Sequence, residues 1–533
     1  MQEISLISVP LVSSAPDSIM SATWHLLTVV AFTVTECVAA SPAPPAAGQF
    51  RAAVLEHELT VPWTCTQNLC TREQAIQLME VNLAVMRGQV AEAASQGASI
   101  ILLPEDGIHG YGFNRHTLPP FLEHVPTVAD GSNPCYEDSM VDDAYVQIQL
   151  SCMAAENNIY VAATMGSVLD DCDQCEDHGS QCFFNTHVVF DKTGALVGVY
   201  HKYNLWTSEL PTFDIDPVPQ LVTVETEFGR LGLSVCADLM WKSPIVDLAE
   251  LSQIDTLLLP LSWWDLFPHQ LAISNQDAWA RGLQVNLLAA NTHDAAGWST
   301  GSGIYTPSGH VAYYHDLAQG SGGKLLVADL DIKPKKQEIN WSGFANGNVD
   351  NFEASQGLFS EVVYDDVYNF VPLTSDMTSA KVCTDDQSFC CIAEYEAAFS
   401  SSTFSLGVFS GDHYKDGSVI GHWKMQMCTV IKCDPQNSGQ TCAQDQSWDY
   451  DFLSRSDTIF NKLRLSGTFT EMAGVYPEVL FDSVSLVPDL VSVSGDGVLS
   501  LVEDADMLPL VSMSLFGRVY HQDPDMPEQF CPA

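Results

Sequence analysis

Short apolar runs alternate with segments of helical periodicity between residues 50 and 330, and this alternation constrains the fold most strongly. The runs have the length and apolar character of buried strands. One helical segment, residues 71–97, begins with Thr71 and Gln74 in the pattern of a capping box. Repeated strand–helix units predict an α/β layered domain over residues 50–335. The strand-like runs are 50–57, 99–106, 159–168, 229–238, 256–264, 286–291 and 323–331, and the further helical segments are 143–158, 243–253 and 269–284. Residues 185–202 are predicted to contain a hairpin with its turn at Lys192-Thr193-Gly194.

The character of the chain changes after Lys336. Residues 336–380 are polar and loop-rich, and we interpret them as a linker region. Residues 381–522 contain several strand-like runs with paired cysteines, so they predict a smaller, mostly β domain, followed by a tail over 523–533. The clearest of these runs are 404–411, 424–433, 463–469 and 510–520.

The N-terminal region has the pattern of a secretory signal. An apolar stretch from Trp24 to Val34 precedes the small residues Val38-Ala39-Ala40, so residues 1–40 are predicted to be a cleaved signal peptide and 41–49 a linker. Met20 is a possible true start, and a buried helix or a signal anchor is the alternative interpretation. The cysteine count agrees with secretion. Of 16 cysteines, removing Cys37 and setting Cys236 aside leaves 14, an even number that disulfides require.

The chain is strongly acidic. It carries 67 acidic and 21 basic side chains in 533 residues, a formal net charge of −46. That charge excludes nucleic acid as a partner, because binding a phosphate backbone depends on cationic side chains. No segment after the predicted signal approaches the length of a membrane-spanning helix, so we expect no membrane span. The charge itself indicates solubility in an extracellular setting.

Three chemically useful side chains follow predicted strands. Glu105, Lys202 and Cys236 each stand where a strand-like run ends, and loops after strand ends are where α/β folds place functional groups. A thiol near a base and a cation can act as a nucleophile. Each residue alone has an ordinary interpretation. A cysteine at a strand end is usually a core residue, a Pro-Glu-Asp turn is usually solvated, and a lysine is usually a surface charge.

Glu105, Lys202 and Cys236 each lie within a longer sequence motif. The segments LLPEDGIHGYGFNR (102–115), VYHKYNLW (199–206), LSVCADLMW (233–241) and NLLAANTH (286–293) together resemble the nitrilase superfamily of carbon–nitrogen hydrolases. Within it they resemble the vanin and biotinidase branch. The C-terminal segments FCCIAEYE, MCTVIKC, LSGTF, YPEVLF and SLFGRVY are similar to the small domain that this branch appends.

The resemblance implies a fold and a mechanism. The fold is a four-layer α-β-β-α sandwich with a smaller, mostly β C-terminal domain. Cys236 is the implied nucleophile, Glu105 the general base and acid, and Lys202 the group that stabilises the oxyanion. Glu209 is a candidate for a second glutamate that supports the lysine, with a simple loop charge as the alternative. The branch usually has a Phe where this chain has Ala237, and we expect the smaller side chain to reshape the substrate pocket.

The remaining cysteines are interpreted as disulfide partners. Cys172, Cys175 and Cys182 with His178 superficially resemble zinc ligands, but their spacing is irregular and the compartment is expected to be oxidising. The resemblance places disulfide cysteines near Cys135, Cys152, Cys172 and Cys182, and Cys175 is additional to that set. Cys383, Cys390, Cys391, Cys428, Cys433 and Cys442 are also expected to be bridged, with the pairing left open.

Two surface features remain. Asn340-Trp341-Ser342 is a glycosylation sequon in a chain expected to be secreted. Trp263 and Trp264 either line the pocket entrance or serve only for packing.

The resemblance implies a small-molecule amide substrate and neither cofactor nor metal. Cleavage of pantetheine to pantothenate and cysteamine is the first hypothesis, and release of biotin from biocytin or biotinyl peptides is the second. A catalytically inactive secreted binding protein is the third, and the presence of all three site residues disfavours it. The oligomeric state is open.

Overall fold

The structure is a computed structural model, and it describes residues 43–137, 144–170, 172, 181–343, 349–363, 366–399, 402–414, 422–433, 442, 454–502 and 507–523. The predicted signal peptide, Met20, Cys175, His178 and the tail beyond residue 523 lie outside the described residues. Within the described part, no helix is both long enough and apolar enough to cross a membrane.

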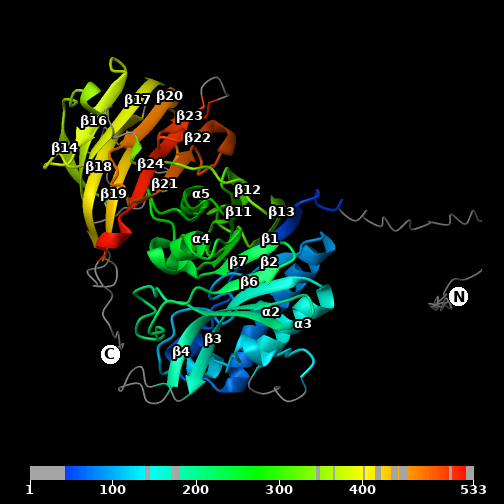
Figure 1. Cartoon of the computed structure of the whole chain (residues 1–533). Coiled ribbons are helices and arrows are strands. Elements are labelled where there is room, and N and C mark those ends of the chain that lie inside the picture. Colours follow the sequence, from blue (N-terminus) through cyan, green and yellow to red (C-terminus); the bar gives the residue numbers. More distant parts are fainter. Residues whose placement is uncertain are drawn as a thin grey trace, which may run out of the picture. The chain divides into compact units, whose positions relative to one another are not determined.

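Two sheets form the centre of the N-terminal domain (Figure 1). One has the strand order β10-β1-β2-β3-β4-β5, with β13 paired antiparallel to β1, and the other has the order β12-β11-β9-β8-β7-β6. The strands of the first sheet are β1 (Gln49–Glu58), β2 (Ile100–Leu102), β3 (Tyr160–Asp170), β4 (Gln181–Phe190), β5 (Leu196–His201), β10 (Thr292–His293) and β13 (Lys324–Asp331). Those of the second are β6 (Thr223–Thr226), β7 (Gly229–Leu233), β8 (Thr256–Pro260), β9 (Asn286–Ala290), β11 (Ser302–Thr306) and β12 (Gly309–Tyr314).

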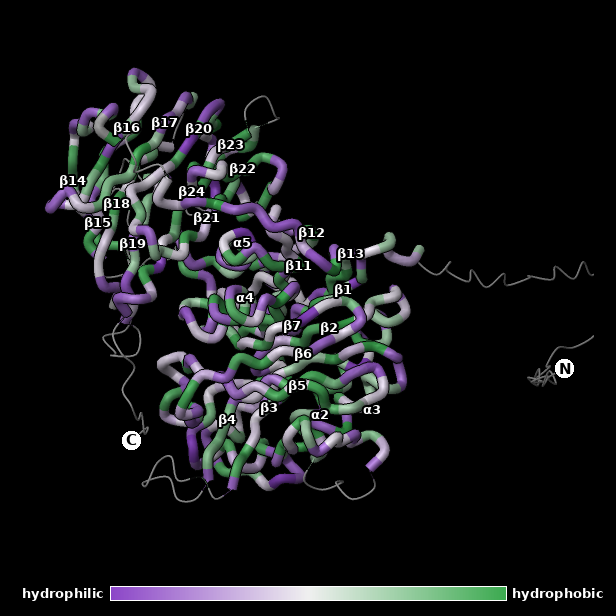
Figure 2. The backbone as a smooth tube through the Cα atoms, in the orientation of Figure 1, coloured by the Kyte–Doolittle hydropathy of each residue, from purple (hydrophilic) through white to green (hydrophobic). Residues whose placement is uncertain are grey.

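Helices cover the outer faces of both sheets. Successive side chains of β1 point to opposite faces of its sheet. Ala53 and Leu55 pack with the helices α2 and α3, while Ala52 and Val54 pack against the second sheet. The helix α5 joins the core of the second sheet from its other side. The helices are α1 (Trp63–Gln67), α2 (Arg72–Ser95), α3 (Tyr145–Asn157), α4 (Asp247–Glu250) and α5 (Ala272–Leu283). This is the expected four-layer α-β-β-α sandwich, and in Figure 2 the hydrophobic colour gathers on central strands such as β2 and β7.

The sequence signals for the first long helix are confirmed. The side chain of Thr71 accepts a hydrogen bond from the backbone of Gln74, whose own side chain accepts one from the backbone of Thr71. This reciprocal pair satisfies two donors that a helix start would otherwise leave free. Helix α2 therefore begins where the capping box predicts.

The C-terminal part is a second sandwich, made of two antiparallel sheets around a separate core. One sheet has the order β14-β15-β18-β19-β24-β21 and the other β16-β17-β20-β23-β22. The strands are β14 (Phe359–Val363), β15 (Asp366–Leu373), β16 (Ser379–Cys383), β17 (Cys390–Ala398), β18 (Thr403–Tyr414), β19 (His422–Cys433), β20 (Ile459–Gly467), β21 (Gly474–Phe481), β22 (Val491–Val493), β23 (Leu499–Leu501) and β24 (Leu510–Arg518).

Strands β14 and β15 occupy a region that the sequence pattern indicates as linker. Their burial pattern explains the difference: Val362 and Val367 are exposed, whereas the carboxyl groups of Glu361 and Asp366 are buried. Glu361 accepts a hydrogen bond from the backbone of Cys442, and Asp366 contacts His413 at 2.6 Å. In these two strands acidic side chains point inward and valines point outward, the reverse of the usual arrangement. The sequence therefore lacks the alternation of apolar and polar residues by which a strand is recognised.

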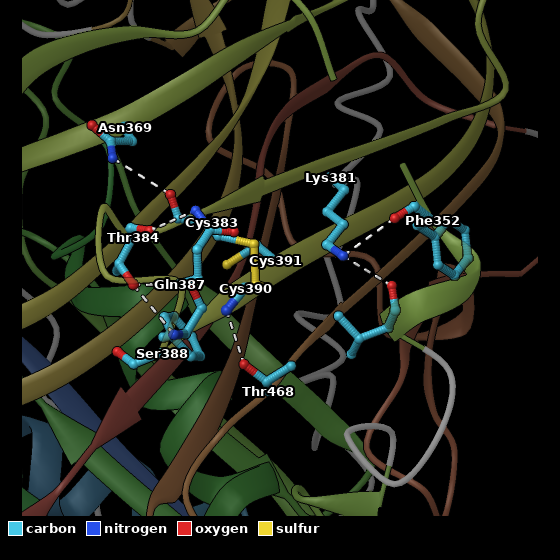
Figure 3. The surroundings of a disulfide bond; sticks show 12 residues. Phe352, Asn369, Lys381, Cys383, Thr384, Gln387, Ser388, Cys390, Cys391 and Thr468 are labelled. Carbon is cyan, nitrogen blue, oxygen red and sulfur yellow. Dashed lines mark hydrogen bonds between the residues drawn. A yellow bond between two sulfur atoms is a disulfide. The ribbon is translucent and has the colours of Figure 1, made fainter. Parts of the chain in front are cut away.

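Disulfides reinforce both domains. The pairs in the described residues are Cys65–Cys70, Cys135–Cys152, Cys172–Cys182, Cys383–Cys390, Cys391–Cys428 and Cys433–Cys442. Figure 3 shows the hairpin between β16 and β17, where Cys383 and Cys390 are joined and the backbone of Cys390 donates to Thr468. The next residue, Cys391, bonds to Cys428 of β19 and so links the two sheets of the sandwich. Cys172 and Cys182 are bonded to each other, as the oxidising interpretation predicts.

The Cys391–Cys428 bond closes a loop with a sequence separation of 37, against 5 for Cys65–Cys70. Because loop-closure entropy grows with loop length, replacing Cys391 and Cys428 by Ala should lower the free energy of unfolding by about 3–4 kcal/mol. The Cys65→Ala/Cys70→Ala pair should cost roughly 2 kcal/mol. Urea unfolding followed by circular dichroism measures both, and equal losses would contradict the expectation.

Candidate active site

Strand ends of both sheets meet at one site. Glu105 follows β2, Lys202 follows β5, and Cys236 follows β7, so the first sheet supplies the base and the cation while the second supplies the thiol. The three side chains are buried, and the Nζ atom of Lys202 lies 2.7 Å from Oε1 of Glu105. The structure therefore brings together all three residues that the sequence motifs single out.

Lys202 lies between two carboxylates. Its Nζ atom donates to Oε1 of Glu105 and, at 2.5 Å, to Oε2 of Glu209. Burial lowers the pKa of Lys202, but the charges of Glu105 and Glu209 outweigh that effect and hold the pKa well above its ordinary value. The lysine therefore stays protonated, and Glu209 is a direct partner of Lys202, not an isolated loop charge.

The backbone at Cys236 is unusual. Cys236 has a φ of 42°, in the left-handed region that residues other than glycine rarely adopt. It begins the 3-10 turn η4 (Cys236–Met240), directly after an extended Val235. Such a conformation persists only where the surrounding structure determines it, and it occurs often at functional sites. Among the cysteines that the structure describes, Cys236 alone has a free thiol.

The thiol and the carboxyl of Glu105 form a proton-sharing pair. Burial raises the pKa of Cys236 well above its ordinary value, and the Glu105 charge adds to this increase. Burial also raises the pKa of Glu105, while Lys202 and the hydrogen bond from Cys236 act in the opposite direction. The resting pair is therefore a thiol donating to a carboxylate, and this thiol could ionise by passing its proton to Glu105.

A cavity of about 500 Å³ opens onto these groups. This volume is within the range of small-molecule sites. Trp263 is almost buried, whereas Trp264 is half exposed, and both line the cavity as one of the two sequence interpretations expects. Its aromatic walls are Tyr111, Phe113, Trp206, Phe213, Trp263 and Trp264, and its polar walls include Asp106, Ser208, Ser262 and Gln270.

Ala237 directly follows the thiol residue, at the place where the branch usually has a Phe. Its side chain is buried within η4 and is not part of the lining of this cavity. The effect of this small side chain on the shape of the pocket stays a prediction.

Sequence reasoning missed Asn185. From β4, its Nδ2 atom donates to Oε1 of Glu105 at 2.9 Å and to Oε1 of Glu209 at 3.0 Å. A neutral amide can satisfy two neighbouring carboxylates without adding a charge. No local pattern marks this residue, since it stands inside an ordinary strand.

Sequence reasoning also missed Asp238. Its carboxylate accepts hydrogen bonds from the backbone of Val235, from the backbone and side chain of Asn204, and from the hydroxyl of Tyr200. Burial raises the pKa of Asp238 to about 6, against these four hydrogen bonds, which lower it. Asp238 therefore ties the turn of the thiol to the loop that carries Lys202. Its position two residues after Cys236 is the one signal that could have drawn attention to it.

Comparison with known proteins agrees with this geometry. Residues 51–332 match the family model for the carbon–nitrogen hydrolases, and residues 359–523 match the vanin C-terminal domain. The chain belongs to the carbon–nitrogen hydrolase family. Pantetheinase of Homo sapiens is 36% identical over 483 residues, covering 89% of this chain and 90% of that protein. Pantetheinase of Mus musculus is 36% identical over 95% of this chain and 94% of its own length, and biotinidase of Takifugu rubripes is 34% identical over 89% and 94%.

Membership confirms the resemblance seen in the motifs, including the vanin-type C-terminal domain. It also confirms that the protein is an enzyme of the amide-hydrolysing class. The carbon–nitrogen hydrolase model matches the part of the chain that contains Glu105, Lys202, Glu209 and Cys236.

The two glutamates should affect the pH profile differently. As the expected general base, Glu105 must be a carboxylate, and its raised pKa predicts that activity falls as pH decreases through a value above the ordinary 4.5. Glu105→Gln should lower kcat by roughly 10²–10⁴-fold. Because the charge of Glu209 raises the pKa of Glu105, Glu209→Gln should move the acid limb to lower pH.

The pH dependence of kcat/KM for both variants measures these effects. Glu225→Gln, which alters an exposed carboxylate paired with Arg230, is the matched control and should keep the wild-type profile. An acid limb that stays in place in Glu209→Gln would show that Glu209 does not influence the base.

Proposed function

We propose that this protein is an amidase that hydrolyses pantetheine to pantothenate and cysteamine through an acyl-thioester on Cys236. The observation that carries the proposal is the free, buried thiol at a positive φ, hydrogen-bonded to Glu105 beside a protonated Lys202. Pantetheinases at 36% identity over most of the chain support the choice of substrate.

Acylation follows from the arrangement of the three groups. The Sγ atom of Cys236 attacks the amide carbonyl carbon while the thiol proton passes to Glu105. Lys202 and Asn185 both donate to Oε1 of Glu105, which leaves the second carboxylate oxygen to receive this proton. Lys202 and the backbone N–H of Ala237 stabilise the negative oxygen of the tetrahedral intermediate. Glu105 then protonates the amine nitrogen as the C–N bond breaks.

Deacylation uses the same base in reverse. After the amine departs, Glu105 removes a proton from a water molecule that attacks the thioester carbonyl. The carboxylic acid leaves, and the proton returns to Sγ of Cys236. The raised pKa of Glu105 suits both steps, because the group must accept and release one proton in each half of the cycle.

The cavity supports a linear amide of moderate size. Its aromatic walls can bury an aliphatic chain, and polar groups such as Ser208 and Gln270 can pair with hydroxyl or amide groups along it. Asp106 adds a half-buried carboxyl group whose pKa is raised well above its ordinary value by desolvation and by the charges of Glu105 and Glu209. A neutral acid of this kind can donate a hydrogen bond to a substrate oxygen.

Biotin release from biocytin or biotinyl peptides is the second candidate. A biotinidase at 34% identity over 89% of the chain favours it. Both substrates contain a linear secondary amide, so the same catalytic groups would serve either reaction. The difference is in the acyl group that the aromatic walls accept.

We also propose that the protein is secreted. The six disulfides of the described residues are typical of an oxidising compartment. Asn340 of the sequon is exposed, as a glycan acceptor must be. Both features agree with an extracellular enzyme.

Purified protein incubated separately with pantetheine and with biocytin tests the proposal. We expect cysteamine and pantothenate from pantetheine at a kcat/KM at least tenfold above that for biocytin. Product mass spectrometry measures both reactions. Turnover of biocytin alone would reject the choice of substrate.

Cys236→Ala tests the mechanism in the same assay. It should abolish turnover because Cys236 carries the only free thiol in the described part of the chain. Rapid quenching of the wild type should yield an acyl adduct on the peptide that contains Cys236. Full turnover by the variant, or an adduct on a different cysteine, would reject the mechanism.

A further inference from the structure

We propose that Arg518 of the C-terminal sandwich is a positioning residue for the nucleophile, acting through the carbonyl of Met240 at the end of the turn that begins with Cys236. The proposal rests on the proposed function, since it assigns a role in the same site. Arg518 is the last residue of β24, and its Nε atom donates to the Met240 oxygen at 3.0 Å. Arg518 of the C-terminal domain thus binds the last carbonyl of the turn that carries Cys236 in the N-terminal domain.

The guanidinium is held rigidly from its own domain. Its Nη1 atom donates to the backbone oxygen of Lys424 at 2.7 Å, and its Nη2 atom lies 2.9 Å from the carboxylate of Asp523. The side chain is fully buried, and the rings of Trp423 and Tyr520 lie 5.7 and 4.7 Å from it. Because its two terminal nitrogens bind two fixed partners, the Lys424 oxygen and the Asp523 carboxylate, the remaining Nε donor has a defined direction.

The turn needs such an anchor at its end. Cys236 holds a positive φ, which surrounding contacts must maintain. At the start of the turn, Asp238 binds the backbone of Val235 and the loop after Lys202. At its end, the carbonyl of Met240 has no partner within so short a turn and receives the hydrogen bond of Arg518. The turn is therefore fixed between two anchors, one from each domain.

The packing around this hydrogen bond joins the domains. The ring of Trp241, directly after the turn, meets the ring of Trp423 edge to face at 6.1 Å. Met240, Trp423 and Phe516 belong to one continuous hydrophobic cluster with Cys236. A displacement of β24 would therefore reach the turn through both the hydrogen bond and the apolar contact.

Arg518→Lys tests the proposal because it keeps the charge opposite Asp523 but loses the fork that reaches Met240. We expect kcat to fall roughly 10- to 100-fold, as for a misplaced reacting group, with KM within about twofold of the wild type. The rate of Cys236 alkylation by iodoacetamide should fall by about tenfold, since alignment with Glu105 sets thiol ionisation.

Tyr313→Phe is the matched control. Its hydroxyl accepts a hydrogen bond from the backbone of Leu486, so this variant removes another single hydrogen bond between the domains without touching the turn. It should keep wild-type kcat and alkylation rate. Equal losses in both variants, or wild-type kcat and alkylation in Arg518→Lys, would overturn the proposal.

Asp523→Asn provides a second test should Arg518→Lys not fold. It loosens the guanidinium but retains Arg518, so kcat and alkylation should each fall by severalfold, and unchanged values would overturn the proposal. The alkylation rate needs no substrate. A wild type that hydrolyses neither amide would reject the proposed function, while alkylation of the variants would still decide the role of Arg518.

Discussion

The buried ammonium of Lys202 between two carboxylates is the interaction on which the site depends. A buried cation is stable only when opposite charge and hydrogen bonds surround it, so Glu105 and Glu209 must both lie close. Two carboxylates against one ammonium leave an excess negative charge in a largely buried region. Asn185 relieves part of this cost with a neutral donor to both. The charge of Glu209 also contributes to the raised pKa of Glu105. Glu105 therefore both stabilises the buried lysine and can exchange a proton.

The nucleophile depends on a different kind of support. Its turn belongs to the second sheet, whereas the base and the lysine belong to the first, so the catalytic geometry requires the two sheets to stay in register across their common core. Asp238 makes this connection directly by binding both Val235 and the Asn204 loop. The C-terminal sandwich is in contact with the end of the same turn through Arg518 and with α5 through the stacked rings of Trp279 and Tyr476, 4.0 Å apart. The second domain is thus packed against the elements that position the thiol.

Patterns over a few neighbouring residues predicted those helices and strands that depend on interactions between neighbouring residues. The capping box of Thr71 and Gln74 predicts the start of α2, and the apolar runs predict the central strands, because both patterns act over a few residues. The same reasoning failed where long-range contacts reverse the pattern. Glu361 and Asp366 are buried by partners far away in the sequence, so β14 and β15 resemble a polar linker. Asn185 gave no signal either, since its partners Glu105 and Glu209 are 80 and 24 residues away.

By itself the sequence determined the layered α/β class and the family, and the family resemblance singled out Glu105, Lys202 and Cys236, because the motifs that carry it are short and contiguous. It could not determine which oxygen of Glu105 the lysine contacts, or that Arg518 reaches Met240 across a sequence separation of 278. These features exist only after both sheets and both domains have packed. Cys236 shows the difference most clearly. Its position in a motif marks it as a nucleophile, but the pKa of its thiol depends on burial and on charges that only the folded chain brings beside it.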